Sequence, residues 1–268
     1  MNALVFACVA LALLPLLAVL SYVIIQGVSR LNLSVFQELP PPPLVPGGGF
    51  GNAIVGTLIM VGIGALISIP FGVLAAIYLT EFSTGKVSEW TRFATNVLSG
   101  VPSIIVGVFA YSIIVLTTRT YSAWAGGFAL AILMLPIIVR TTDEALQLVP
   151  DELRQASVGL GATNFQTVFK VILPAAIPAI ITGATLAIAR AAGETAPLLF
   201  TALFTQFWPN WNNYLMEPTA SLAVLVYNFA TVPFQNQQEL AWAASFILVF
   251  LVLIASTIAR LATARRVY

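Results

Sequence analysis

Residues 152–174 read "ELRQASVGLGATNFQTVFKVILP" and form a polar, patterned segment between two long apolar runs. The first half predicts a short helix, because Asp151 directly before it can cap the helix N-terminus. Gly161 can adopt the left-handed backbone conformation that commonly ends a helix. We therefore expect a short helix over "ELRQASVGL" that ends at Gly161.

The second half of the segment predicts another short helix. Thr163 and Gln166 have the spacing of a capping box, in which each side chain accepts a hydrogen bond from the other residue's backbone N–H. Apolar residues then recur at the i, i+3, i+4 and i+7 positions until Pro174: Phe165, Val168, Phe169 and Ile172. Two amphipathic helices need a cover for their apolar faces, which either the protein's own helix ends or a separate subunit provides.

The composition of the whole chain is that of an integral membrane protein. Of 268 residues, 59% are hydrophobic and 8% are charged, and the mean hydropathy is +0.98. Soluble domains carry about 25% charged residues. A membrane-spanning helix needs about 20 apolar residues. Six uncharged stretches are candidate spans: 1–29, 51–80, 93–118, 120–139, 171–189 with its continuation 195–216, and 240–259.

Basic residues predict the orientation of these spans. Residues 1–29 carry no basic leader and are too long for a signal peptide, so we interpret them as a retained first helix. Six spans place both termini on one side of the membrane. Eight basic residues fall on that side, whereas Arg30 and Arg119 fall on the other: Lys86, Arg92, Arg140, Arg154, Lys170, Arg260, Arg265 and Arg266. The excess of basic residues predicts that both termini are cytoplasmic.

Several classes of site are excluded by the residues that the chain lacks. It has no histidine, and its single cysteine, Cys8, lies in the first span. A histidine acid/base site, a Cys/His metal site and a disulfide framework therefore cannot form. The Gly85-Lys86 pair lacks the remaining residues of a phosphate-binding P-loop. We expect no catalytic residue, no metal and no cofactor, so another chain must supply energy for any work.

The chain divides into two parts. Residues 1–50 contain the first helix and a Pro/Gly-rich outward loop, and residues 51–268 form a five-helix domain that includes the cytoplasmic loop 140–174. The proline tract of the first loop favours a stiff spacer over a binding loop. The second outward loop, 206–238, carries "FWPNWNNY", which favours an aromatic belt at the membrane interface, although it could also receive a soluble partner. Residues 83–97 predict a helix on the inner membrane surface.

The cytoplasmic loop resembles the EAA loop of ABC-importer permeases. That pattern is Glu-Ala-Ala, three residues, Gly, nine residues, Ile, any residue, Leu-Pro. The matching positions in this chain are Gln155, Ala156, Ser157, Gly161, Val171, Leu173 and Pro174. Gln155 replaces the glutamate, Ser157 the second alanine and Val171 the isoleucine. The resemblance implies a coupling helix that docks into a groove of an ATPase subunit, with the polar contact of the missing glutamate in doubt.

Three further segments resemble the phosphate-specific members of these permeases: "GVPSIIVGVFA" at 100–110, "LPIIVRTTDEALQLVPDELRQAS" at 135–157 and "ARAAGETAPLLFTA" at 189–202. The last segment is more similar to the PstA branch than to the PstC branch. The resemblance implies an all-α MetI-like core of six transmembrane helices in the bacterial plasma (inner) membrane. It also implies three kinds of protein partner besides lipid and phosphate, and no nucleic acid. These are a PstC-like second permease subunit, two PstB-like ATPase subunits and an extracytoplasmic PstS-like phosphate-binding protein.

Arg190 and Glu194 stand in an otherwise apolar run, and with Thr195 they are the candidate substrate pathway. A charged residue inside the bilayer usually faces a bundle interior or a water-filled path. The guanidinium can hold a phosphate oxyanion with two parallel hydrogen bonds, and the carboxylate can accept one from the hydroxyl of monohydrogen phosphate. The alternative is that two residues at i and i+4 merely neutralise one another. The sequence leaves the depth of the pair in the membrane open.

Two other functions remain alternatives to phosphate import. Molybdate, tungstate or sulfate would also need an arginine, but none of them needs an acceptor for a substrate hydroxyl at neutral pH. An intramembrane enzyme would need an acid/base or metal site, and Glu194 is the one candidate inside the membrane. The sequence therefore favours a phosphate permease subunit over both alternatives.

Overall fold

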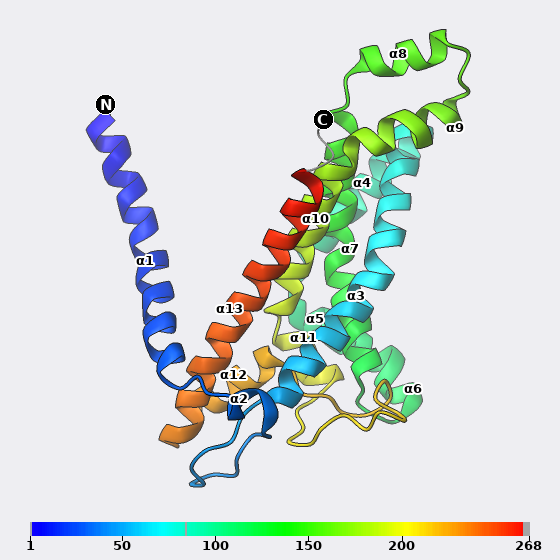
Figure 1. The fold of residues 1–268 in the computed structure, drawn as a ribbon. Coiled ribbons are helices and arrows are strands. Elements are labelled where there is room, and N and C mark those ends of the chain that lie inside the picture. The colour runs from blue at the N-terminus through cyan, green and yellow to red at the C-terminus, as the bar shows by residue number, and fades with distance from the viewer. Residues whose placement is uncertain (1, 84, 265–268) are drawn as a thin grey trace.

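The computed structural model describes residues 2–83 and 85–264, and the elements that it describes are helices and turns (Figure 1). Five helical segments in this part are long and apolar enough to cross a membrane: Cys8–Ser29, Gly51–Phe82, Ala123–Gln147, Asn164–Ala192 and Gln235–Leu261. They correspond to α1 (Asn2–Ser29), to α3 (Gly51–Ile77) with the π-helical turn η1 (Tyr78–Phe82), to α7 (Ala123–Gln147), to the continuous run α9 (Asn164–Thr167), η3 (Val168–Ile172) and α10 (Leu173–Ala192), and to α13 (Gln235–Ala264).

The centre of the bundle is formed by α3, α7 and α10. Small residues allow close approach of these helices, as is usual where lipid tails surround a bundle and packing drives association. Gly183 of α10 lies directly against Thr141 of α7. A shared apolar cluster joins α3 and the middle of α7 to the last turns of α10, with members that include Met60, Leu130, Met134, Ala187 and Ala191.

The predicted third span, 93–118, is not one straight helix. A helix α4 (Lys86–Ser99) is followed after a break by α5 (Ser103–Ala110), η2 (Tyr111–Val115) and α6 (Leu116–Thr118), and the two parts meet at 99°. Pro102 at this break has no N–H to donate, and it disfavours helical geometry at the residue before it. The expected surface helix is present as α4, whose Trp90, Phe93 and Val97 side chains are exposed. Its position on a membrane surface stays a prediction.

The predicted continuation of the fifth span, 195–216, is wrong. Helix α10 ends at Ala192, residues 193–195 are not helical, and α11 (Ala196–Thr201) is only six residues long. Pro197 explains the break, because it can occupy the first turn of a new helix but cannot donate to the end of the preceding one. Leu203, with a left-handed φ of 62°, follows α11 and turns the chain away.

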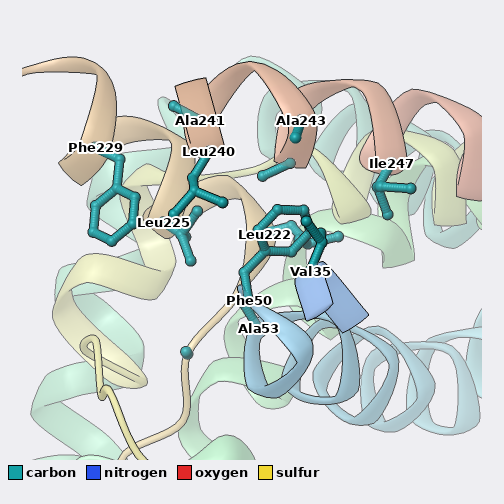
Figure 2. Packing of buried hydrophobic residues seen from close by; sticks show 12 residues of the cluster. Val35, Phe50, Ala53, Leu222, Leu225, Phe229, Leu240, Ala241, Ala243 and Ile247 are labelled. Carbon is teal, nitrogen blue, oxygen red and sulfur yellow. The ribbon is translucent and has the colours of Figure 1, made fainter. Parts of the chain in front are cut away.

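The predicted outward loop 206–238 contains a buried helix, α12 (Leu222–Ala230). Figure 2 shows Leu222 and Leu225 of α12 packed between Leu240 of α13 and Phe50, which precedes α3. Val35 of the short helix α2 (Ser34–Gln37) completes this cluster. This end of the bundle therefore has an apolar core of its own, in part formed by residues that the sequence analysis assigned to a loop.

The proline-rich segment before α3 is fixed to the start of α13. Arg30 donates to the Gly47 carbonyl at 3.2 Å and to the Asn236 side chain at 3.1 Å, and Gln237 donates to the Pro41 carbonyl at 3.0 Å. Helix α1 packs on the same region of α13, where Tyr22 and Trp242 meet edge to face at 5.0 Å. The other end of α1 diverges from the bundle (Figure 1) and lies at the same end of the molecule as α8 (Asp151–Gly159) and the end of α13. If the bent pair from α4 to α6 counts as one span, the described part has six spans, and this even number agrees with the arrangement.

Candidate functional site

The charged pair lies at the break between α10 and α11. Arg190 is in the last turn of α10 and Glu194 is in the non-helical residues that follow. Arg190 Nε and Glu194 Oε1 are 3.5 Å apart, which is an ion pair. The pair forms across the helix end, because backbone N–H groups of Gly193 and Glu194 bond back to Arg190 and Ala191 at 3.1 and 3.2 Å. The predicted pairing is present, but not on one uninterrupted helical face as expected.

Packing against α7 gives the depth of Arg190 in the bundle. Gly183 lies beside Thr141. Because α10 and α7 run in opposite directions, Arg190, about 10.5 Å further along α10, comes level with residue 134. The middle of α7 is residue 135 of the range 123–147. The charged pair is therefore near the middle of a helix that can span the membrane, which the sequence left open.

Exposure differs strongly between the two charged side chains. The Arg190 side chain is 57% exposed and the Glu194 side chain is 18% exposed. Thr182, Leu186 and Arg190 recur every four residues on one face of α10, and all three are exposed. A charged side chain at the bilayer centre costs at least about 2.5–3.5 kcal/mol if it faces lipid. This face of α10 therefore has to meet water or another protein chain.

Thr195 contributes its backbone to the break. It is the residue before α11, and its carbonyl accepts hydrogen bonds from the N–H groups of Leu198 and Leu199 at 3.1 and 3.2 Å. Thr195 thus fixes the direction in which the chain leaves the charged pair. The structure brings all three predicted pathway residues together at one point of the bundle.

The loop between α7 and α10 contains the two predicted helices, and the first of them begins differently from the prediction. Asp151 makes no side-chain cap; Pro150 occupies the cap position, and Asp151 lies in the first turn of α8, where its charge complements the helix dipole. Gly161 has the expected left-handed φ of 85°. The capping box between Thr163 and Gln166 is confirmed, with hydrogen bonds of 3.0 and 3.3 Å.

Pro174 does not end the second helix, contrary to expectation. The run from Asn164 to Ala192 is one continuous helical segment. The π-helical turn η3 (Val168–Ile172) directly precedes Leu173 and Pro174. A proline removes one backbone hydrogen bond and crowds the carbonyl four residues earlier, and a π-helical turn is a local adjustment that accommodates both. The second loop helix therefore continues into α10 without a break.

The apolar faces of the loop are covered in part by the chain itself. Val168 and Ile172 are buried against Ile77 and Leu146 at the ends of α3 and α7. Leu160, at 90% exposure, and Phe165, at 62%, stay uncovered. The second helix is thus covered by the protein's own helix ends, which was one of the two expectations, and cover of the turn by another chain stays a prediction.

The residues that match the EAA pattern differ in exposure. Gln155 and Ala156 are exposed on α8, whereas Ser157 is buried and its hydroxyl lies 2.9 Å from the Thr167 hydroxyl. The serine that replaces the second alanine of the pattern thus joins α8 to α9 by a hydrogen bond. Leu173 and Pro174 lie at the start of α10, where the loop meets the membrane-spanning part.

Two ion pairs at this end of the molecule were missed by the sequence analysis. Arg154 of α8 bonds to Glu81 of η1, and Arg92 of α4 bonds to Asp143 of α7. The partners are separated by 73 and 51 residues, so no local spacing reveals them. The available signal was that each acidic residue sits at the end of an apolar stretch and needs a partner.

Comparison with known proteins decides the family. Residues 68–267 match the family model described as binding-protein-dependent transport system inner membrane component. The phosphate transport system permease protein PstA of Haemophilus influenzae is 42% identical over 97% of this chain and 92% of its own length. PstA of Yersinia pestis is 41% identical over 94% of this chain and 84% of its own length. The chain belongs to the PstA permease family.

Solved structures show the same fold at low sequence identity. A MetNI methionine ABC transporter chain aligns with a TM-score of 0.65 and 20% identity, covering 81% of this permease and 95% of that chain. A bacterial alginate ABC transporter chain aligns with a TM-score of 0.68 and 14% identity, covering 98% of this permease and 93% of that chain. The MetI-like fold class expected from the sequence is confirmed, and the permease is a multi-pass membrane protein.

Proposed function

We propose that this permease is a transmembrane subunit of an ATP-driven ABC importer of inorganic phosphate in the bacterial plasma (inner) membrane. It would form half of the translocation path beside a PstC-like permease subunit. Two PstB-like ATPase subunits would drive it, and an extracytoplasmic PstS-like protein would deliver phosphate. The observation that carries this proposal is identity of 41–42% to permeases named for phosphate transport, over at least 94% of this chain.

The charged pair supports a role in holding an anion. The more exposed Arg190 side chain can turn its guanidinium fork away from the chain and donate two parallel hydrogen bonds to a phosphate oxyanion. The less exposed Glu194 neutralises the guanidinium when phosphate is absent, and it can accept a hydrogen bond from monohydrogen phosphate. Thr195 directly follows Glu194 in the chain. In this mechanism the exposed face of α10 is one wall of the path, and the second permease subunit supplies the other.

The same helix links this site to the ATPase. The exposed Gln155, Ala156, Leu160 and Phe165 would dock the ATPase, with Gly161 setting the turn between the two loop helices. From the start of α9 the helix continues unbroken to α10, so Arg190 is about 39 Å along one helical path from the docking loop. Movement of the docked loop would therefore move Arg190 directly.

Orientation and domain division belong to the same proposal. The end of the bundle that carries α8 would face the cytoplasm, with both termini, because it gathers most of the basic residues. Residues 1–50 would be a peripheral helix with its outward loop, and residues 51–268 the permease domain. The match of the family model to 68–267 supports this division.

The test compares variants of the charged pair in the complete transporter. Arg190→Gln should lower phosphate uptake by about 30-fold or more, since loss of charge-assisted hydrogen bonds to the phosphate costs about 2 kcal/mol. Arg190→Lys should retain part of the uptake, because lysine keeps the charge but loses the fork. Arg140→Gln is the matched control, because Arg140 and Glu144 form another i, i+4 pair that is 62% and 59% exposed.

The double variant separates a pathway role from simple neutralisation. If the two residues only neutralise each other, Arg190→Gln combined with Glu194→Gln should restore assembly and uptake. A double variant that assembles but does not import phosphate supports the pathway role. A double variant that transports at the wild-type rate would contradict the pathway role. Import of molybdate or sulfate in place of phosphate by the wild-type complex would contradict the assigned substrate.

A further inference from the structure

The end of α3 is a junction between three other elements. Its last turn, η1 (Tyr78–Phe82), is π-helical, a geometry that is frequent at functional sites. Thr80 and Glu81 are adjacent in this turn and bond to different parts of the protein. We call the five residues of this network the α3 junction: Thr80, Glu81, Arg92, Asp143 and Arg154.

Glu81 is held by the helix that would dock the ATPase. Arg154 of α8 donates from Nη1 to both carboxylate oxygens of Glu81, at 2.7 and 2.6 Å. The Glu81 side chain is only 7% exposed and that of Arg154 is 23% exposed. A pair so shielded from water is screened far less than a surface ion pair.

The same arginine also binds the end of α7. Its Nη2 donates to the Leu146 carbonyl at 2.8 Å, in the last turn of that helix. Helix α8 otherwise packs on η3 and α9, and Figure 1 shows it standing away from the ends of α3 and α7. The Arg154 side chain is therefore a polar bridge from α8 to two spanning helices.

Thr80 extends the network to α4. Its hydroxyl donates to Asp143 Oδ1 at 2.7 Å. Arg92 holds the same carboxylate from α4 through Nε to Oδ2 at 3.0 Å and Nη2 to Oδ1 at 2.9 Å. One turn of α3 thus connects to α8 on one side and to α4 and α7 on the other.

An ion pair here is not explained by stability alone. Replacing a buried pair with well-packed apolar residues is often neutral or stabilising, whereas removing one partner is strongly destabilising. Arg154, however, bonds to Glu81 through Nη1 and to the Leu146 carbonyl through Nη2, and these two bonds from different nitrogens fix the direction of its guanidinium as well as the distance. A directional contact is what is needed where one element must follow the movement of another.

We infer that the Arg154–Glu81 bridge is a positioning contact that makes α3 and α7 follow the ATPase-docking helix α8. The inference rests on the proposed transport function. The α9–α10 helix carries movement of the loop to Arg190 through the backbone. The α3 junction carries the same movement through side chains to α3, α7 and α4, so that the other helices of the bundle move in step.

The test measures phosphate imported per ATP hydrolysed by the complete transporter in lipid vesicles. Glu81→Gln and Arg154→Lys should each lower this ratio by about tenfold or more while ATP hydrolysis continues. Glutamine loses the charge, and lysine lacks the planar fork through which Arg154 bonds to Glu81 and to the Leu146 carbonyl from two different nitrogens. Asp151→Asn is the matched control, because Asp151 also pairs with Arg154, at 3.5 Å, but its side chain is 85% exposed.

A second variant distinguishes positioning from structural support. Glu81→Leu combined with Arg154→Met restores apolar packing, so a merely structural bridge predicts a wild-type ratio for it. Our inference predicts a complex that assembles and hydrolyses ATP but imports little phosphate per ATP. If a single variant fails to assemble, the ratio measured for this double variant tests the inference instead. A wild-type ratio in Glu81→Gln or in the double variant overturns the inference. Failure of the wild-type complex itself to import phosphate would instead overturn the proposed function.

Discussion

The contact between α7 and α10 predicts that Gly183→Ala damages the bundle. A Cβ atom added at Gly183 would lie 2.5 Å from Thr141 Cβ and would also overlap Thr141 Oγ1. Carbon atoms in ordinary contact are about 3.5–4.0 Å apart. Rotation of the threonine side chain cannot relieve the overlap, because its Cβ is fixed to the backbone of α7. The two helices must therefore separate by about 1.0–1.5 Å at this level.

The cost of this separation follows from the packing of the centre. Overpacking of a well-packed interior costs about 1–3 kcal/mol. For a chain of this size, each 1 kcal/mol lowers the melting temperature by about 2–4 °C, so we expect a decrease of about 2–12 °C. Arg190 is about 10.5 Å further along the same helix, so phosphate uptake should fall as well.

The assay is thermal unfolding of the purified complex in detergent, followed by uptake in vesicles. Gly62→Ala is the matched control, because Gly62 lies in α3 and an added Cβ there meets no atom within 4 Å. This control also accounts for the higher helix propensity of alanine, worth up to about 1 kcal/mol. Adding Thr141→Gly to Gly183→Ala should restore part of the stability. If the Gly183→Ala complex had the same melting temperature as the Gly62→Ala complex, the reasoning would be refuted.

Two further predictions concern the loop and the topology. In a Cys8→Ala background, a cysteine that replaces the 90% exposed Leu160 should react with a membrane-impermeant label only when the label has access to the cytoplasmic side. A cysteine that replaces the exposed Asn212 should react with the label added outside. The reverse pattern would contradict the proposed orientation. Gly161→Val places a β-branched residue at a φ of 85°, so it should weaken co-purification with the ATPase and lower uptake about tenfold while membrane insertion persists. Normal co-purification and uptake in this variant would count against the docking role.

Local signals predicted the parts of the fold that are local. The capping box of Thr163 and Gln166 and the left-handed Gly161 depend on residues a few positions apart, and the structure confirms both. The apolar spans were recognisable because length and composition alone decide whether a helix can cross a membrane. The EAA spacing pointed to the loop helices for the same reason: its residues are close in the sequence.

Prolines show where local signals fail. Pro70 and Pro136 lie inside long helices, whereas Pro102 follows a helix end and marks a 99° bend. The residue type is the same, and the outcome depends on whether neighbouring helices and local adjustments satisfy the freed backbone groups. The sequence analysis interpreted Pro174 as a helix end because proline usually breaks a helix. In the structure the helix continues past Pro174, directly after a π-helical turn. The bridge from Arg154 to Glu81 was likewise not predictable, because only the folded chain brings these residues together.

The difference in exposure within the charged pair supports the pathway interpretation, which stays a prediction, over simple neutralisation. Two residues that served only to neutralise each other would be expected to be shielded together, because each charge is costly in the membrane unless it is paired. Glu194 is largely enclosed by its own chain, but most of the Arg190 side chain is exposed on a face that cannot be turned to lipid. The 3.5 Å separation of the charged atoms is also longer than the roughly 2.7–2.9 Å of a strong charge-assisted hydrogen bond. An anion that offers the guanidinium two short hydrogen bonds can therefore displace the carboxylate, and the carboxylate can reclaim the arginine when the anion leaves.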